Sequence, residues 1–418
     1  MSKGVPELRF PGFKGEWQIK SVGRLLKRAS DPVRVQPEET YREIGVRSHG
    51  RGVFHKAPVS GAELGDKRVF HVVPDALVLN IVFAWEQAVA MTSSDEQGFI
   101  ASHRFPMFFE NAGQSYLPFI RLLLLTPRGK MLLKIASPGG AGRNKTLGQD
   151  AFLKLKTRVP ERDEQKRIAD FLDATSRKIT LLNDKKTALE DYKRGLMQRL
   201  FSRELRFTRD EGSAFPDWEE RKLGEIATFF KGKGISKSDI VEGGALPCIR
   251  YGEIYTHYRE RITEVISFTD DDPASLFLSE IGDVIIPASG EDRMDMARAC
   301  CVAIAGVALG GDINVLRSPI NGDYLAYYLN NERRREIANL GQGNSVVHLY
   351  PSQLRTLTVE IPHLDEQRKI AAALSALDAK IDAMSQKISE MEAFKKGLLQ
   401  KGTSIFQHSR LFRAGLAV

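Results

Sequence analysis

Cysteine is scarce in this sequence. The 418 residues include only Cys248, Cys300 and Cys301, and none of them lies in a CxxC or Cys/His spacing. This argues against a disulfide framework or a cysteine-ligated zinc site and predicts reduced thiols. Long apolar runs are also missing, because the most apolar stretch, FIRLLLLTP, is short and carries Arg121. Residues 1–20 contain no apolar segment of a secretory signal. We therefore expect a cytoplasmic protein without a membrane-spanning segment.

Catalytic motifs are incomplete. GGAGRNKT at 139–146 resembles a phosphate-binding loop, but Asn144 replaces its second glycine, and the following LGQDAFLKL is predicted to be strand-like where such a loop needs a helix. FKGKG at 230–234 fits a loose methyl-donor pattern, yet the chain lacks the Pro-Pro pair with which adenine methyltransferases hold a flipped base. No histidine pairs recognisably with a serine or cysteine nucleophile. The sequence thus predicts no catalytic residues and no metal site.

Acidic residues are fewer than basic ones, and the balance differs between the two halves of the chain. The 61 Lys and Arg outnumber the 53 Asp and Glu, which gives a net charge of +8. Residues 1–160 hold 24 basic and 14 acidic residues, a net charge of +10, whereas residues 205–361 hold 17 and 24, a net charge of −7. A basic surface favours a polyanionic partner such as nucleic acid. In the second half, local clusters of basic residues would have to bind that partner.

The sequence contains an internal repeat. At an offset of 202, sixteen of forty-one positions match between residues 160–200 and 362–402. Residues 13–25 likewise resemble 215–226, whereas the middle of each copy shows no convincing similarity to the other. The chain is therefore two copies of one plan with divergent middles.

Each copy ends in a long predicted helix that opens on the triplet DEQ, at residues 163–165 and 365–367. Negative charge suits the free N–H groups of a helix N-terminus, so we predict that the acidic pair and the glutamine cap the helix and dock partners.

Apolar residues recur in a heptad pattern along both helices, which predicts that they pair as an antiparallel coiled coil. Lys186, Lys193 and Lys395 interrupt the pattern and predict looser packing toward the C-terminal ends of the helices. The predicted coiled-coil residues are Ile168, Leu172, Ile179, Leu182, Leu189, Leu196, Ile370, Leu374, Leu377, Ile381, Met384, Ile388, Met391 and Leu398.

The divergent middles mix strand-like runs, such as GDVIIPASG and TLTVEIP, with the helical pattern YLAYYLNNERRREIANL. Each is predicted to be a mixed α/β domain. Loops rich in glycine, arginine and tyrosine are candidates for DNA binding, because Arg and Asn pair with base edges and aromatic rings stack on bases. The candidates are Arg47, His49, Arg51, Lys56, Arg143, Asn144, Lys145, Arg250, Tyr251, Tyr255, Tyr258, Arg259, Arg261, Asn344, Ser345 and His348.

The repeated motif P-x-x-DEQ-x-x-IA-x-x-L, which opens a heptad helix ending K-x-G-L-x-Q, and the lead W-x-x-x-x-[VL]-G resemble the specificity subunit of type I restriction-modification systems. The resemblance covers nearly the whole chain. It implies an α+β fold: two mixed α/β target recognition domains, two long helices in an antiparallel coiled coil, and a pseudo-two-fold internal repeat. The implied divisions are recognition domains at 1–160 and 205–361, spacer helices at 161–204 and 362–405, and a tail at 406–418.

In that family each recognition domain reads one half of a bipartite double-stranded DNA target, and the coiled coil fixes the spacer and docks two modification (methyltransferase) subunits. Restriction (endonuclease/translocase) subunits join the full complex, which serves host defence. The resemblance implies no cofactor in this chain, with S-adenosylmethionine, ATP and Mg²⁺ on the partner subunits. A coiled-coil adaptor without base readout and a self-contained restriction-methylation polypeptide are the alternatives. The divergent middles count against the first alternative and the missing catalytic motifs against the second.

Overall fold

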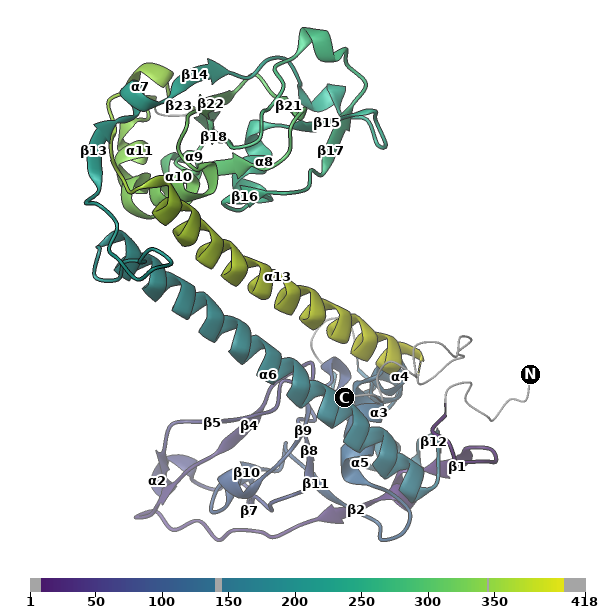
Figure 1. Ribbon diagram of the computed structural model, residues 1–418. Coiled ribbons are helices and arrows are strands. Elements are labelled where there is room, and N and C mark those ends of the chain that lie inside the picture. Colours follow the sequence, from purple (N-terminus) through teal and green to yellow (C-terminus); the bar gives the residue numbers. More distant parts are fainter. Residues whose placement is uncertain (1–8, 140–144, 344–345, 402–418) are drawn as a thin grey trace. The chain divides into compact units, whose positions relative to one another are not determined.

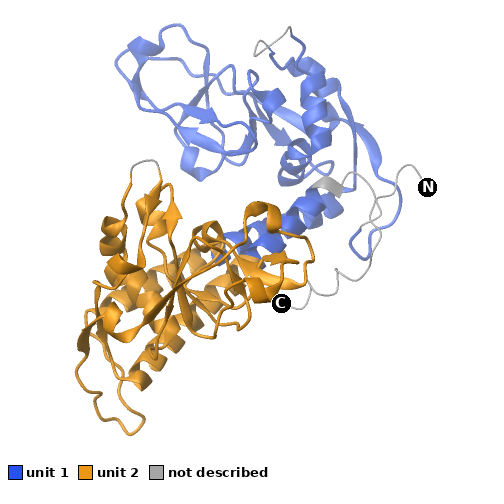
Figure 2. Cartoon of the chain, turned by 90° about the horizontal axis from the view of Figure 1, so that it is seen from above, with its two compact units in different colours: residues 1–182, 387–418 blue, residues 183–386 orange. Residues whose placement is uncertain are grey.

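The computed structural model describes residues 9–139, 145–343 and 346–401 (Figure 1). The chain forms two compact units: the first unit comprises residues 1–182 and 387–418, and the second unit comprises residues 183–386 (Figure 2). Each unit holds part of both long helices, α6 (Arg162–Phe201) and α13 (Leu364–Lys401). Among the described residues, no helix is both long and apolar enough to cross a membrane.

The first unit is built on an antiparallel four-stranded sheet in the order β2-β11-β8-β9. The strand pair β1–β12 leads into this sheet and out of it, with Gln18 opposite Val159. Smaller pairs, β3–β6, β4–β5 and β7–β10, extend one side. The bounds are β1 (Gln18–Ser21), α1 (Val22–Leu25), β2 (Leu26–Ala29), β3 (Thr40–Tyr41), β4 (Ile44–Val46), β5 (Val53–His55), β6 (Val59–Ser60), α2 (Gly61–Leu64), β7 (Val69–His71), β8 (Leu77–Leu79), η1 (Ala84–Glu86), β9 (Val89–Met91), η2 (Ser94–Glu96), β10 (Ile100–Ser102), β11 (Met107–Glu110), α3 (Leu117–Leu125), α4 (Pro127–Ile135), α5 (Gln149–Lys154) and β12 (Lys156–Val159).

The second unit is built on a five-stranded sheet in the order β14-β22-β18-β20-β16. The pair β13–β24 leads in and out, with Glu219 opposite Ile361. A three-stranded sheet, β17-β15-β21, and the pair β19–β23 complete it. The bounds are β13 (Glu219–Lys222), α7 (Leu223–Ile226), β14 (Thr228–Lys231), η3 (Lys237–Asp239), β15 (Leu246–Ile249), α8 (Tyr251–Thr256), β16 (Arg261–Ile262), β17 (Ser267–Thr269), η4 (Pro273–Ser275), β18 (Asp283–Pro287), β19 (Ser289–Gly290), α9 (Arg293–Met296), β20 (Cys300–Val302), β21 (Ala308–Leu309), β22 (Ile313–Arg317), α10 (Gly322–Tyr328), η5 (Leu329–Arg333), α11 (Arg334–Leu340), β23 (Val347–His348), α12 (Pro351–Leu354) and β24 (Thr358–Ile361).

The two sheets share one plan. In each, four strands follow the same order and are all antiparallel, β2-β11-β8-β9 in one and β14-β22-β18-β20 in the other. In each, two helical segments follow the second strand of that order, namely α3 and α4, or α10 and α11. The repeat therefore includes the middles, where the sequences show no similarity.

The prediction that LGQDAFLKL is strand-like is wrong. Gln149–Lys154 form helix α5, and only Lys156–Val159 are a strand. The Phe152 side chain is fully buried, so a single helical turn places it in the core. A helix therefore does follow GGAGRNKT, as a phosphate-binding loop requires. The argument against such a loop now rests on Asn144, which replaces the second glycine and lies outside the described residues.

The long helices pair in opposite directions. In the first unit the rings of Phe171 and Phe394 lie 6.3 Å apart, centroid to centroid, and in the second unit Lys193 of α6 meets Asp378 of α13. A residue early in α6 thus faces one late in α13, and the reverse, so the pairing is antiparallel. Every predicted coiled-coil residue is buried or half-buried.

Lys193 makes a polar contact between the two long helices. Its side chain is 13% exposed, and its Nζ donates to both carboxylate oxygens of Asp378 at 2.7 and 2.8 Å. Tyr327 of α10, which is fully buried, donates its hydroxyl to the same carboxylate at 2.5 Å. The interruption in the heptad pattern is therefore a polar contact that joins α10 to both long helices.

The glutamine of each DEQ triplet links its helix to the start of another. Gln165 Nε2 donates to the Pro160 carbonyl at 2.9 Å, and its Oε1 accepts from the backbone N–H of Tyr116, just before α3, at 2.9 Å. Gln367 does the same with the Pro362 carbonyl at 2.8 Å and the Asn321 N–H, just before α10, at 2.9 Å. These side chains bond to other segments, so the prediction that they cap their own helices is wrong.

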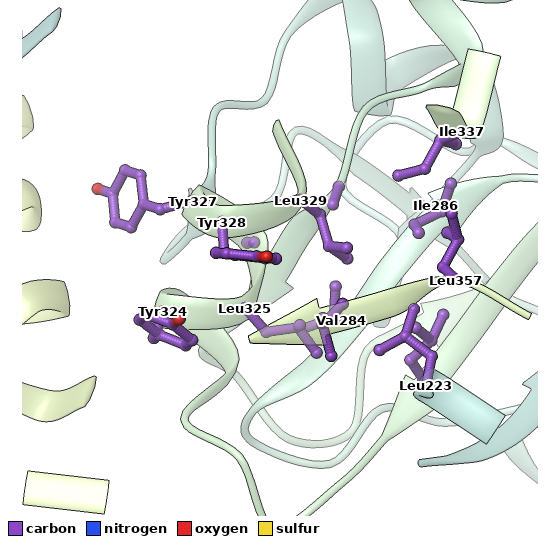
Figure 3. Packing of buried hydrophobic residues seen from close by; sticks show 14 of the residues in the cluster. Leu223, Val284, Ile286, Tyr324, Leu325, Tyr327, Tyr328, Leu329, Ile337 and Leu357 are labelled. Atoms are coloured by element: carbon purple, nitrogen blue, oxygen red, sulfur yellow. The ribbon is translucent and has the colours of Figure 1, made fainter. Parts of the chain in front are cut away.

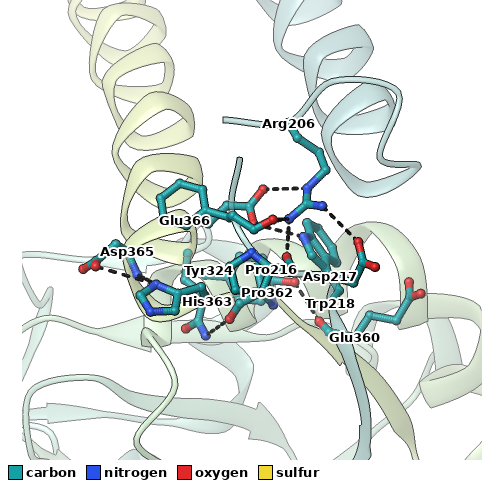
Figure 4. Close-up of polar contacts among 12 residues, drawn as sticks. Arg206, Pro216, Asp217, Trp218, Tyr324, Glu360, Pro362, His363, Asp365 and Glu366 are labelled. Atoms are coloured by element: carbon teal, nitrogen blue, oxygen red, sulfur yellow. Dashed lines mark hydrogen bonds and ion pairs between the residues drawn. The ribbon is translucent and has the colours of Figure 1, made fainter. Parts of the chain in front are cut away.

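The glutamate of each triplet is buried against an arginine. Glu366 is fully buried, and Arg206 donates to its two oxygens at 3.1 and 2.9 Å, while Trp218 Nε1 donates at 3.2 Å (Figure 4). In the first unit Arg9 donates to both oxygens of Glu164 at 2.7 and 2.6 Å. We call each arrangement the helix-start brace.

The core of the second unit adjoins its brace. Tyr324, Leu325 and Tyr328 of α10 pack in one cluster with Val284 and Ile286 of β18 (Figure 3). Phe201, the last residue of α6, meets the rings of Tyr324 and Tyr328 at centroid distances of 6.1 and 5.6 Å. The end of one long helix and the start of the other are thus packed into the same core.

Replacing Arg206 with Ala should lower the free energy of unfolding by about 3 kcal/mol, because the Glu366 carboxylate would stay buried without a countercharge. Denaturant unfolding followed by tryptophan fluorescence measures this loss. Arg177→Ala is the matched control, because the Arg177–Asp173 pair is exposed on α6 and should contribute nothing measurable. Equal stability of the two variants would contradict the brace.

Candidate nucleic-acid interface

Three predicted DNA-binding residues of the first unit lie in one hairpin loop. Arg47, His49 and Arg51 follow β4, precede β5 and are exposed. His49 has a left-handed backbone, φ 60°, as do the glycines on either side of Arg51. The His49 N–H donates to the Glu86 carbonyl at 2.8 Å, which fixes the loop against η1. The backbone of the loop is therefore held in one conformation, and its basic side chains are exposed.

Lys145 reaches the same short helix. Its Nζ lies 5.3 Å from the centroid of the Trp85 ring, and Trp85 belongs to η1. The structure thus brings the predicted loop and Lys145 together around η1, although they are far apart in sequence. Arg143 and Asn144 lie outside the described residues.

Lys56 lies apart from that loop. It is 3.6 Å from the Glu43 carboxylate and lines a hollow of about 350 Å³ with Lys67, His103 and Arg104. The predicted set therefore divides between two places in the first unit.

Most predicted residues of the second unit make contacts within their own unit. Arg250 Nη2 lies 2.8 Å from the buried Glu253 carboxylate, Arg259 lies 3.0 Å from Asp382, and Arg261 pairs with Asp323. Tyr258 is buried, and burial raises its pKa to about 12. These contacts give the four residues structural roles, and their part in DNA binding stays a prediction.

Tyr251 and Tyr255 line a cleft of the second unit with a volume of about 920 Å³. Both belong to α8, and Tyr251 is 38% exposed. The cleft also contains Lys231, Lys237 and His257, none of which the motif analysis selected. FKGKG at 230–234 drew attention only as a methyl-donor pattern, whereas the structure places Lys231 and Gly234 in the wall of this cleft.

The same two tyrosines line a neighbouring hollow with Ser289, Asp295 and Val346. Val346 and His348 flank the start of β23, and both are exposed. The tyrosines of α8 thus lie beside the predicted loop ahead of Leu349. Asn344 and Ser345 lie outside the described residues.

No group of three or more His, Cys, Asp or Glu among the described residues is placed to hold a metal ion. Burial raises the pKa of the Cys248 thiol to about 11 and that of Cys300 to about 12. Such thiols are poor nucleophiles at neutral pH.

The family model described as the type I restriction modification DNA specificity domain matches residues 80–191 and 216–393, which together exceed half of the chain. The chain belongs to this family. The two matched ranges fall one in each copy of the repeat, so each copy contributes a specificity domain.

Two curated relatives come from Methanocaldococcus jannaschii. The type I restriction enzyme MjaVIII specificity subunit is 23% identical over 262 residues, 59% of this chain and 61% of the relative. The putative type I restriction enzyme MjaX specificity subunit is 26% identical over 269 residues, 61% of this chain and 60% of the relative. The matched region thus spans less than two thirds of either relative.

Solved structures share the fold. The HsdS subunit from Thermoanaerobacter tengcongensis matches with a TM-score of 0.52 and 17% identity, covering 94% of this chain and 96% of that one. The type I restriction-modification S subunit from M. genitalium matches with a TM-score of 0.58 and 15% identity, covering 96% and 100%. The predicted fold class, two mixed specificity domains with two long antiparallel helices, is confirmed.

The specificity-domain thiols provide a test of the packing. At pH 7.5 all three native cysteines should resist a thiol reagent, because burial keeps them protonated and covered. Titration with a chromogenic disulfide should count no fast-reacting thiol in the native chain and three after denaturation. The exposed Ser213→Cys variant is the positive control, and one fast native thiol in the unmodified chain would contradict the core packing.

Proposed function

We propose that this chain is the DNA-specificity subunit of a type I restriction-modification complex. Each specificity domain reads one half of a bipartite target, and the paired helices fix the spacer between the halves. One observation carries the proposal: a single sheet plan occurs twice in the chain, with unrelated loops on each copy. A repeated frame with different loops is what reading two different half-sequences requires.

The exposed loops have the chemistry for DNA. The first unit presents Arg47, Arg51 and Lys145 around η1, and its sequence up to residue 160 carries a net charge of +10. Cationic side chains bind phosphates without regard to sequence, while contacts to base edges supply specificity. The second specificity domain is acidic, so we propose that it depends on local basic groups and on a partner subunit for phosphate contacts.

The long helices supply a docking surface for modification subunits. Leu181 and Tyr192 of α6 are 67% and 61% exposed, although both are large and apolar. A partner subunit that covered these side chains would remove their apolar surface from water. We propose that two methyltransferase subunits bind along the helices and that restriction subunits join them. S-adenosylmethionine, ATP and Mg²⁺ would bind to these partners and not to this chain.

Exchanging residues 30–150 for the corresponding segment of another specificity subunit should change one half of the methylated motif and leave the other half and the spacer unchanged. The reason is that the exchange replaces the loops of one domain and retains both long helices. Sequencing of methylated adenines in cells that carry the chain and its modification subunits measures the result.

Exchanging residues 230–340 is the reciprocal control and should change the other half only. A motif that survives both exchanges would favour a coiled-coil adaptor without base readout and would refute the proposed function.

A further inference from the structure

The large cleft of the second unit has nitrogen-bearing side chains that the fold does not use. Lys231, Lys237 and His257 line it and are exposed. Within the described part of the chain, no hydrogen bond or ion pair involves these three side chains. The lining also holds three acids: Glu253 binds Arg250, Asp239 accepts from the Ser236 N–H at 2.7 Å, and Asp312 is exposed.

The wall that carries the two lysines is held in one shape. The Lys233 N–H donates to the Leu309 carbonyl, and the Gly311 N–H donates to the Gly234 carbonyl, both at 2.8 Å. A Cβ atom at Gly232 would lie 2.0 Å from the Gly310 carbonyl oxygen, so the backbones of the two segments are in direct contact. The cleft is therefore formed before a ligand arrives, which lowers the entropic cost of binding.

The backbone conformation of Ile235 is of a kind that occurs at binding sites. Ile235 is a β-branched residue with a left-handed backbone, φ 57°, and its side chain is buried with Cys248 and Ala308. Such a conformation is costly for a β-branched residue and persists only where the surroundings impose it, often at binding sites. Here it turns the chain between Lys231 and Lys237, so that both face the cleft.

The shape of the cleft indicates which part of DNA it accepts. Base edges lie inside the grooves, where protruding side chains reach them, whereas the sugar–phosphate backbone is a convex, anionic ridge. A concave, preformed cleft into which two lysines without an ion-pair partner among the described residues reach fits that ridge. Tyr251 and Tyr255 both line this cleft and the neighbouring hollow that holds Val346, and of the two tyrosines Tyr251 is the exposed one.

We infer that this cleft holds the phosphate backbone of the duplex through Lys231, Lys237 and His257, and that the exposed Tyr251 contacts the bases of the second half-site. The inference rests on the proposed function and assigns separate roles to its residues. The lysines position the duplex on a domain of net negative charge, and the tyrosine contributes to sequence choice.

The test uses the complete methyltransferase complex and measures duplex binding by fluorescence anisotropy over a range of salt concentrations. The Lys231→Ala, Lys237→Ala double variant should weaken binding on the order of tenfold and reduce the slope of log K against log salt by about 1.8, or about 0.9 per lost contact. Its methylated motif should stay unchanged. Lys222→Ala, an exposed lysine on β13 outside the cleft, should change neither quantity.

Tyr251→Ala should relax the methylated motif at a position in the second half only, while the salt slope stays unchanged. An unaltered slope in the double-lysine variant, or a motif that keeps every position in Tyr251→Ala, would overturn the inference. The salt slope can be measured on any duplex, so the double-lysine variant still tests the cleft even if the wild-type complex methylates no split motif. A wild-type complex that methylates no split motif would refute the proposed function and not the role of the lysines.

Discussion

A buried carboxylate at the start of each long helix is the interaction on which the rest of the molecule depends. Glu164 and Glu366 cannot remain charged in the interior without a cation, so Arg9 and Arg206 must lie against them. Each arginine brings its own stretch of chain to that place. The neighbouring glutamines then fix the starts of α3 and α10 to the same point. Sheet, helices and connecting segments are thus joined where each long helix begins.

The sequence predicted the long helices well, because a heptad pattern is local and repeats. It did not reveal the common sheet of the two copies. The matching strands are short. For example, β8 (LVL) and β18 (DVIIP) are both buried and both pair antiparallel with their neighbours, but their sequences differ. Helix α5 was missed for a similar reason: six residues carry too little periodicity to distinguish a helical turn from a strand.

For the candidate interface, the sequence shows charge but not pairing. Only the fold shows that Asp382 and Asp323 lie beside Arg259 and Arg261, whose part in DNA binding stays a prediction. Lys231 and Lys237 look ordinary until a strained turn and a second loop place them in one cleft. Contacts between segments distant in the chain decide both cases, and no local pattern encodes them.

The separation of the braces and cores from the loops has an evolutionary consequence. In the second unit Tyr324, Tyr328 and the Glu366 carboxylate are buried far along the chain from the exposed Tyr251 and Lys237. Substitutions on the exposed loops therefore cost little folding stability and escape the selection that acts on the interior. Such a protein can vary the residues of its exposed loops while its scaffold stays the same.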